Sequence, residues 1–424
     1  MSRRFTLYVL IAMILGIIVG YMVNVTVGDV ATVTSIAGYL SLATDIFLRL
    51  IKMIIGPLVF STLVAGIAHM GSSGGALGRI GLRTMGWFLS ASLISLLLGI
   101  VMVTLLQPGA ALNLPLPEAG ASAAVQTSAL SLRDFVVHLV PKSVFEAMAN
   151  NEILQIVVFS VFFGVAIAAV GEKARGVLGA VDQLVLIMLK ITGYVMRVAP
   201  LAVFAALAST VATQGLSILL TYGKFIGGFY ASLALLWTVL IGIGGLVIGP
   251  SVLRLVGDMR APILLAFSTA SSEAAYPRTL EQLERFGVSK RIASFVLPLG
   301  YSFNLDGSMM YCTFATIFIA QAYGVDLSWS QKITMLLLLM VTSKGMAGVP
   351  RASLVVIAAT LAYFNIPEAG LLLILAVDHF LDMGRSATNV VGNSLAAAAI
   401  AKWEGELRPP ERIPAPVGEV AETR

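Results

Sequence analysis

The sequence has few charged residues. Only 12% of its 424 residues are Asp, Glu, Lys or Arg, whereas 58% are hydrophobic. A soluble globular protein carries about 25% charged residues, so this chain has too little polar surface for water. Apolar runs of ~20 residues, long enough to span a bilayer, recur along it. These features exclude a soluble protein and predict an all-α polytopic membrane protein.

Cysteine, histidine and the common catalytic motifs are also scarce. Cys312 stands alone, so no internal disulfide forms, and the histidines at 69, 138 and 379 are scattered. No Cys/His cluster has metal-ligand spacing. The chain has no HExxH helix, GxSxG turn or GKS/T loop. We therefore expect neither an enzyme nor a cofactor.

The net charge of +5 comes from short loops between apolar spans. Basic loops of this kind mark the cytoplasmic side of a membrane protein, so nucleic acid is not expected as a partner. The first apolar span, Phe5–Val25, is too long for a signal peptide and is predicted to be retained. The alternation of basic loops places both termini in the cytoplasm, and the short loops suit a bacterial inner membrane. Further spans are expected at about 40–70, 84–106, 153–170, 178–212 and 222–250.

From residue 258 the simple pattern of spans fails. Two apolar segments end in small, polar, Pro-containing stretches, "ASSEAAYP" at 270–277 and "TSKGMAGVP" at 342–350. Each precedes a long helix that contains charged residues. This repetition is typical of an inverted-repeat transporter with a site near the bilayer midplane; two kinked helices without a special role are the alternative. We predict eight transmembrane helices plus two re-entrant hairpins. The hairpins are expected at about 258–287 and 330–361, and the polar helices at about 291–322 and 366–402.

The last polar helix carries the strongest signal. Its polar residues fall on one stripe about 80° wide at about 100° per residue. They are Asp378, Asp382, Arg385, Asn389 and Asn393. Charges at bilayer depth cost a few kcal/mol, so this stripe must face a partner or a polar cavity. Either an Asp382–Arg385 ion pair closes a packing defect, or the stripe binds substrate. In the second case Arg385 clamps a carboxylate, Asp382 accepts an ammonium group and Asn389 donates to a second carboxylate, which suits aspartate or glutamate.

The preceding polar helix contains Asn304-Leu305-Asp306-Gly307-Ser308. We expect Gly307 to let the helix unwind and to free carbonyl groups for a small cation beside Asp306. A sodium site at Asn304 and Asp306 is one possibility.

Four motifs together resemble one transporter family. The segments "SSEAAYP", "GYSFNLDGS", "TSKGMAGVP" and "DMGRSATNVVGN" are similar to those of the dicarboxylate/amino acid:cation symporter family, which includes the glutamate transporters. The likeness covers nearly the whole chain. It implies a homotrimer in the lipid bilayer and a glutamate-transporter-like elevator fold with a fixed scaffold and a mobile transport domain. The scaffold would comprise 1–70 and 111–220, the transport domain 71–110 and 221–404, and a cytoplasmic tail 405–424.

The resemblance also implies site residues. It places substrate near Ser271, Ser272, Ser308, Gly348, Val349, Asp382, Arg385, Ser386 and Asn389. The coupling cations or protons are expected near Glu273, Gly300, Ser302, Asn304, Asp306, Ser343, Lys344, Asp378 and Asn393.

Several residues depart from the sodium-coupled pattern. Asn393 replaces an aspartate, Leu305 a methionine, and Ala91-Ser92 a Thr-Ser pair, while Glu273 and Lys344 replace neutral residues. The combination looks like the bacterial proton-coupled glutamate/aspartate symporters.

Each hairpin charge has two interpretations. Glu273 is a proton carrier, since burial disfavours a charged carboxylate, or a fixed hydrogen-bond acceptor. Lys344 is a tethered ammonium group in the place of sodium, or a solvated side chain. Arg351 attracts anions or latches a gate.

The sequence therefore predicts a symporter that imports L-aspartate or L-glutamate with protons. A C4-dicarboxylate symporter and a sodium-coupled aspartate symporter are the alternatives. The C4-dicarboxylate members share both hairpins and NLDG but lack the aspartate and glycine of "DMGR". An anion channel remains open, and saturable accumulation against a gradient would separate it from a transporter.

Overall fold

The computed structural model describes residues 3–68, 74–110, 137, 140–215, 222–343, 352–375 and 377–408. Within these ranges the chain is helical, and its only extended pairing is a single antiparallel bridge between Val288 and Leu407. The predicted all-α class is confirmed for this part of the molecule.

The first half consists of long apolar helices. In chain order they are α1 (Arg3–Thr26), α2 (Val30–Ala68), α3 (Gly74–Leu106), α5 (Val144–Ala149), α6 (Ile153–Val170), α7 (Arg175–Val195), α8 (Ala199–Gln214) and α10 (Gly223–Ile248). Among the described residues, five helical stretches are long and apolar enough to cross a membrane. These are Leu7–Thr26, Val30–Ala68, Gly78–Leu106, Ile153–Thr213 and Gly223–Ile248. The molecule therefore has the helices of a multi-pass membrane protein, and the count of eight spans stays a prediction.

The second half is built of shorter helices. They are α11 (Ser251–Asp258), α12 (Arg260–Thr269), α13 (Tyr276–Phe286), α14 (Lys290–Phe303), α15 (Asp306–Ala322), α16 (Trp329–Thr342), α17 (Ala352–Tyr363), α18 (Leu371–Leu375) and α19 (Asp378–Trp403). At 1.5 Å per residue, α12 is about 15 Å long, half the thickness of a bilayer core. The helices of the two predicted hairpins, α12, α13, α16 and α17, have 10, 11, 14 and 12 residues, fewer than the ~20 of a full span, and the re-entrant hairpins stay a prediction.

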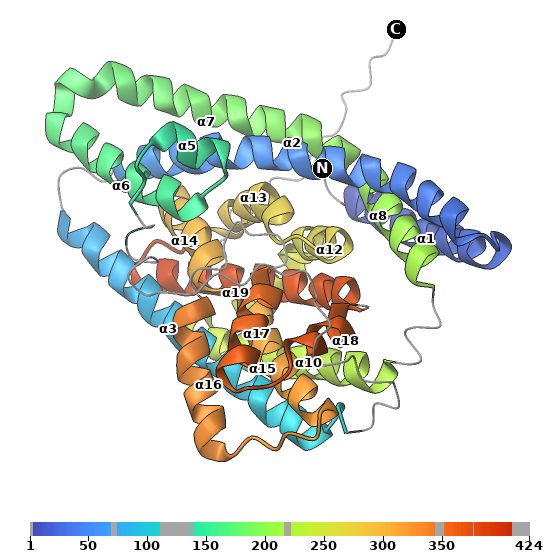
Figure 1. The fold of residues 1–424 in the computed structure, drawn as a ribbon. Coiled ribbons are helices and arrows are strands. Elements are labelled where there is room, and N and C mark those ends of the chain that lie inside the picture. The colour runs from blue at the N-terminus through green and yellow to red at the C-terminus, as the bar shows by residue number, and fades with distance from the viewer. Residues whose placement is uncertain are drawn as a thin grey trace, which may run out of the picture.

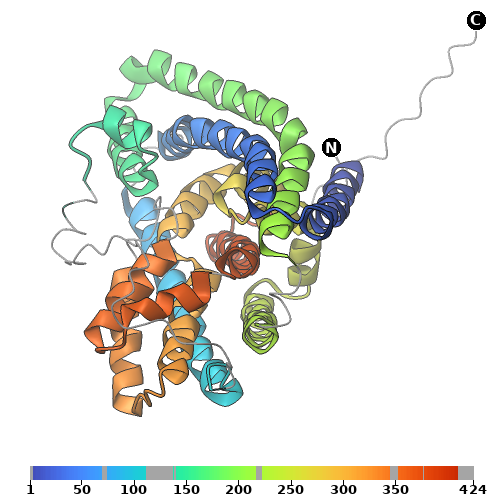
Figure 2. The same cartoon turned by 45° about the vertical axis from the view of Figure 1, so that its right-hand side comes forward.

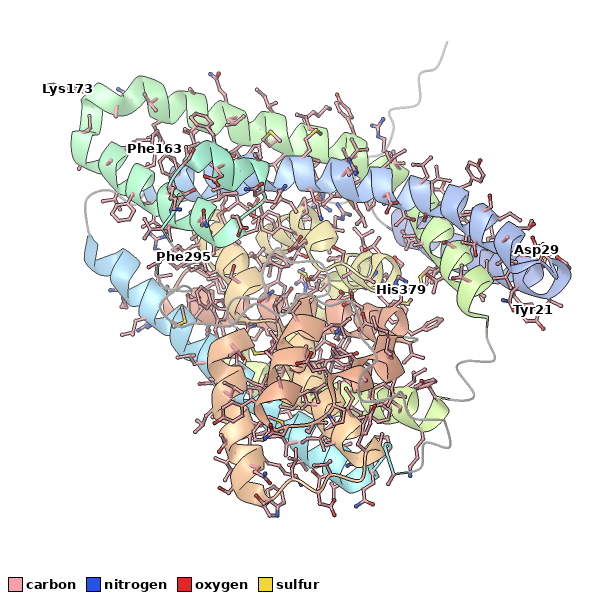
Figure 3. All side chains as sticks on the ribbon, in the orientation of Figure 1. Tyr21, Asp29, Phe163, Lys173, Phe295 and His379 are labelled. Carbon is pink, nitrogen blue, oxygen red and sulfur yellow. The ribbon has the colours of Figure 1, made fainter. Side chains whose placement is uncertain are left out.

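The helices form two groups in space. Figure 1 shows α1, α2, α6, α7 and α8 in one layer along the top, with α3 and α14–α19 below it. Helices α12 and α13 lie between these groups, and α19 passes through the centre of the molecule in Figure 2. Figure 3 shows Asp29 and Lys173 at opposite ends of the upper layer.

Both long polar helices are interrupted rather than continuous. The first is broken at Asn304 (φ −129°, ψ 57°) and Leu305 (φ −93°, ψ 66°), between α14 and α15. The second is divided between α18 and α19, so that Asp378 opens a new helix. Gly307 lies inside α15, two residues beyond the break. The glycine is therefore not the point of unwinding that the sequence suggested.

The segment that follows α19 ties three parts of the lower group together. Glu404 accepts from Arg79 (2.7 Å) and Arg83 (2.8 Å) of α3. Glu406 accepts from Ser289 (2.6 Å) and pairs with Arg291 at the start of α14. The 404–408 segment thus links α3 to the end of α13 and the start of α14.

We expect Glu404→Gln to lower the free energy of unfolding by about 1 kcal/mol. The effect is small because Arg79 and Arg83 are partly solvated, and ion pairs in contact with solvent contribute little. The Arg79 hydrogen bond holds the pKa of Glu404 below its ordinary value. Its contribution to stability is therefore fully present above the ordinary carboxyl value and is lost as pH falls through the lowered pKa. Thermal unfolding in detergent should show the largest difference between variant and parent at pH 7, shrinking below about pH 4.3. A difference that stays constant down to pH 3 would contradict this account.

Candidate functional site

The break between α14 and α15 lies against the middle of α19. The Asn304 side-chain amide donates from one nitrogen to Asp306 Oδ2 and to Asn393 Oδ1, both at 3.1 Å. Ser95 of α3 donates to Asp306 Oδ1 at 3.3 Å. All three residues of the Asn304–Asp306–Asn393 cluster are fully buried. The structure thus gathers these residues from two predicted polar helices around one carboxylate.

Glycines allow this close approach. A Cβ atom on Gly300 would lie 2.3 Å from Asn393 Oδ1, and one on Gly307 would lie 2.6 Å from the carbonyl oxygen of Arg385. Gly307 N donates to Asn389 Oδ1 at 2.9 Å, and Asn389 Nδ2 donates to Ser308 Oγ at 3.3 Å. The absence of side chains at these positions therefore sets the spacing of α14 and α15 from α19.

Arg385 is the centre of a second cluster on the same stripe. Its side chain is 3% exposed, and Nη2 contacts both Asp382 Oδ1 (2.9 Å) and Asp378 Oδ1 (3.2 Å). The guanidinium lies 4.1 Å from the centre of the Tyr311 ring, whose hydroxyl donates to Asp378 at 3.0 Å. Asp382 is 36% exposed, so this cluster opens toward the outside of the protein on that side.

Six buried polar atoms in this region have no hydrogen-bond partner among the residues that the structure describes. They are Ser302 Oγ, Asn304 Oδ1, Ser343 Oγ, Asn393 Nδ2 and, on Arg385, Nε and Nη1. Buried polar atoms are almost always hydrogen-bonded, and unpaired ones call for a ligand or ion. Donors on Arg385 suit an anion, whereas hydroxyl and amide oxygens suit a cation.

Among the described residues, the site holds three carboxylates, on Asp306, Asp378 and Asp382, and the guanidinium of Arg385. Arg385 contacts the carboxylates of Asp378 and Asp382, whereas the carboxylate of Asp306 belongs to the Asn304–Asp306–Asn393 cluster.

The first hairpin lies partly against α2. Ser271 Oγ accepts from the Ala274 amide at 3.2 Å, inside the break between α12 and α13, and Ser272 is buried. Glu273 lines a small cavity with Ile55 of α2 and Tyr301 of α14. The Glu273 side chain thus lies at the contact between hairpin and α2, apart from the Arg385 cluster.

The remaining expected residues divide into two sets. Ser386 is buried on α19 next to Arg385, and Ser343 follows directly after α16. Lys344, Gly348, Val349 and Arg351 lie outside the described residues.

The sequence analysis missed Tyr311 and Ser95. Tyr311 is three residues after Ser308 on α15, so both lie on one helix face. A tyrosine on the polar side of an otherwise apolar helix was the available signal. Ser95 lies one turn after Ser92, which the resemblance had singled out.

Comparison with known proteins extends these observations to the whole chain. The model of the "Sodium:dicarboxylate symporter family" matches residues 5–403. The chain is 40% identical over 406 residues to the proton/sodium-glutamate symport protein of Bacillus subtilis (strain 168), covering 95% of this chain and 93% of that protein. It is 42% identical over 404 residues to the proton/glutamate-aspartate symporter of Escherichia coli (strain K12), covering 93% and 92%.

A third relative bears a different substrate name. The chain is 40% identical over 412 residues to the C4-dicarboxylate transport protein of Anaeromyxobacter sp. (strain K), covering 96% of this chain and 91% of that protein. The family match spans nearly the entire sequence, and the likeness seen in the four motifs is thereby confirmed. This chain belongs to the sodium:dicarboxylate symporter family.

Proposed function

We propose that this protein is a secondary active symporter that imports L-glutamate or L-aspartate with protons. The observation that carries the proposal is the Arg385 guanidinium, buried between Asp378 and Asp382 with Nε and Nη1 unpartnered among the described residues. Buried guanidinium donors of this kind suit a carboxylate ligand, because hydrogen bonds between arginine and carboxylate are charge-assisted and strong. The relatives named glutamate and glutamate-aspartate symporters support the same substrate class.

The carboxylates on α19 favour an amino dicarboxylate over a C4-dicarboxylate. Glutamate and aspartate carry a net charge of −1, because their ammonium group offsets one carboxylate, and Asp382 lies one turn from Arg385 to receive that group. Succinate or malate carries a charge of −2 and has no ammonium group for Asp382 to receive. C4-dicarboxylates are the alternative substrate class, because one of the similar proteins is named a C4-dicarboxylate transport protein.

Proton coupling is favoured by the hydrogen bonding around Asp306. Asn304 Nδ2 already donates to Asp306 and Asn393, so an N–H group lies between the two oxygens that a sodium ion would share. Asn393 also contributes no charge to hold a metal cation. Sodium remains the second candidate, with Asn304 Oδ1 and Ser302 Oγ as its unpartnered oxygen ligands.

An elevator mechanism in a homotrimer is part of the proposal. The described helices form two groups, with the candidate site wholly in the lower one that contains α3, α14, α15 and α19. The upper group would be the scaffold and the lower group the moving transport domain. Such a division lets the site cross the bilayer as a unit.

Uptake of radiolabelled L-aspartate and L-glutamate into proteoliposomes tests the function. We expect accumulation under an inward proton gradient without sodium. Accumulation only under an inward sodium gradient would overturn the proton coupling. Uptake of succinate, with neither amino acid taken up, would favour the C4-dicarboxylate alternative.

Glu273→Gln tests the proposed proton carrier. Because the carboxyl group is the carrier in this proposal, we expect the variant to bind substrate but to lose substrate-dependent acidification of the vesicle interior, at least about tenfold. A pH dye trapped inside the vesicles measures this. Glu368→Gln, an exposed acid before α18, is the matched control and should retain the parent rate. Undiminished acidification by Glu273→Gln would leave Glu273 only the role of a fixed acceptor.

A further inference from the structure

A cavity of about 360 Å³ lies between α1 and the helices α10, α12 and α19. Its lining includes Met13 of α1, Tyr230 and Trp237 of α10, Leu264 and Phe267 of α12, and Gly384 of α19. Figure 2 shows α1 and α10 on the same side of the molecule. The cavity touches α19 beside the stripe that carries Arg385 and is distinct from the candidate substrate site.

The polar atoms around this cavity are already satisfied. The Tyr230 hydroxyl donates to the carbonyl oxygen of Phe380 at 2.6 Å, and Trp237 Nε1 donates to Thr388 Oγ1 at 2.8 Å. Thr388 Oγ1 in turn donates to the carbonyl oxygen of Gly384 at 2.8 Å. Both aromatic side chains thus present carbon to the cavity and direct their polar atoms into the protein. These groups offer no hydrogen-bond partner to a molecule in the cavity. The cavity therefore favours a hydrocarbon chain, which needs none.

The surroundings of the cavity supply such a chain. Helices α1 and α10 both have the length and apolar composition of membrane spans. Ala234, which also lines the cavity, is exposed, so the cavity reaches the molecular surface. Within the hydrocarbon region of a bilayer, an exposed apolar surface contacts lipid rather than water.

A basic residue lies one turn before the α12 residues that line this cavity. Arg260 begins α12, is exposed, and forms no ion pair with any described residue. It precedes Ile263 and Leu264 of the lining by three and four residues, so it shares their helix face. Phe267 lies about 10 Å further along α12. A lipid phosphate at Arg260 would therefore direct an acyl chain along α12 into the cavity.

We propose that this cavity binds one acyl chain of an anionic phospholipid whose phosphate pairs with Arg260. The chain fills the space between α1 and α12 and packs against Gly384, one residue before Arg385. The site is independent of the substrate and of the coupling ion.

Fluorescence of Trp237 tests the proposal. The other three tryptophans are replaced in Trp87→Phe, Trp329→Phe and Trp403→Phe, and the triple variant is reconstituted in dioleoyl phosphatidylcholine vesicles. Dibrominated phosphatidylglycerol or dibrominated phosphatidylcholine is then added at increasing mole fraction. We expect saturable quenching, with half-saturation at a mole fraction about fivefold lower for phosphatidylglycerol, since one arginine at an anionic headgroup gives about that preference.

Two pairs of variants separate a built site from ordinary lipid contact. In the same background, Ala234→Phe narrows the cavity and should abolish the saturable part of the quenching, whereas Leu235→Phe, the adjacent exposed residue outside the lining, should retain it. Arg260→Gln should remove the fivefold preference, and Arg254→Gln, whose arginine pairs with Asp258 (3.6 Å), should not. Quenching proportional to mole fraction and equal in Ala234→Phe and Leu235→Phe would overturn the proposal. Quenching by brominated fatty acid but not by either phospholipid would also overturn it.

Discussion

Arg385→Gln is expected to abolish acidic amino acid transport. The substitution removes the only guanidinium of the described site and leaves Asp378 and Asp382 without their shared partner. Breaking a buried ion pair in this way costs about 3 kcal/mol or more. If that cost falls on substrate binding, the dissociation constant for L-glutamate rises about 100-fold or more.

Binding of radiolabelled L-glutamate to purified protein in detergent measures this effect without the later steps of transport. Arg385→Lys keeps the charge but loses the planar fork, so we expect an intermediate loss of about tenfold. Arg254→Gln, at an exposed position of α11 away from the site, should bind as the parent does. A parent-like affinity in Arg385→Gln, in protein that remains folded by size-exclusion chromatography, would contradict the assignment of Arg385 to the substrate.

The preference between substrates adds a readout that a merely structural arginine would not change. In the parent, bound L-glutamine has no side-chain carboxylate to pair with the buried Arg385 cation. In Arg385→Gln the residue is neutral, so this penalty on L-glutamine binding is removed. We therefore expect the ratio of L-glutamine to L-glutamate affinity to rise in Arg385→Gln. An unchanged ratio would indicate that Arg385 acts only by holding Asp378 and Asp382 in place.

The stripe on α19 could be predicted because it depends only on local geometry. Residues 378, 382, 385, 389 and 393 share a face on any α-helix, and the structure places all of them on one helix. Charged residues on a helix that crosses a bilayer need a polar partner. The helix type and the approximate spans follow from the same local rules.

The partners across helices could not be predicted in the same way. Asn304 and Asn393 are 89 residues apart, and their 3.1 Å contact depends on the register between α14 and α19. The packing of α15 against α19 likewise places the ring of Tyr311 against the guanidinium of Arg385. Apolar runs fix helix length but not register, since many apolar surfaces pack about equally well. The break at Asn304 and Leu305 was likewise predicted at the wrong residue, Gly307. A glycine in an apolar helix can mark either a point where the helix unwinds or a point of close packing, and the sequence alone does not separate the two.

Gly307 provides the second large effect, which follows from that close packing. A Cβ atom at this position would lie 2.6 Å from the carbonyl oxygen and 2.8 Å from the Cα atom of Arg385. Both atoms belong to the backbone of α19, so no side-chain rotation relieves the clash. The two helices must separate by about 0.8 Å to restore ordinary contact, in an interior that is close-packed. This movement stretches the 2.9 Å hydrogen bond from Gly307 N to Asn389 and displaces Arg385 from its partners.

We therefore expect Gly307→Ala to lower the free energy of unfolding by about 3 kcal/mol, at the upper end for overpacked sites, and to reduce L-glutamate uptake at least about tenfold. Thermal unfolding in detergent and uptake into proteoliposomes measure the two effects. Gly227→Ala is the matched control, because its added Cβ atom meets nothing within 4 Å. That variant adds the same methyl group to an exposed position of α10 and should gain or keep stability. Equal behaviour of the two variants would mean that α15 and α19 tolerate a wider spacing, and that the contact at Gly307 does not hold the substrate stripe in place.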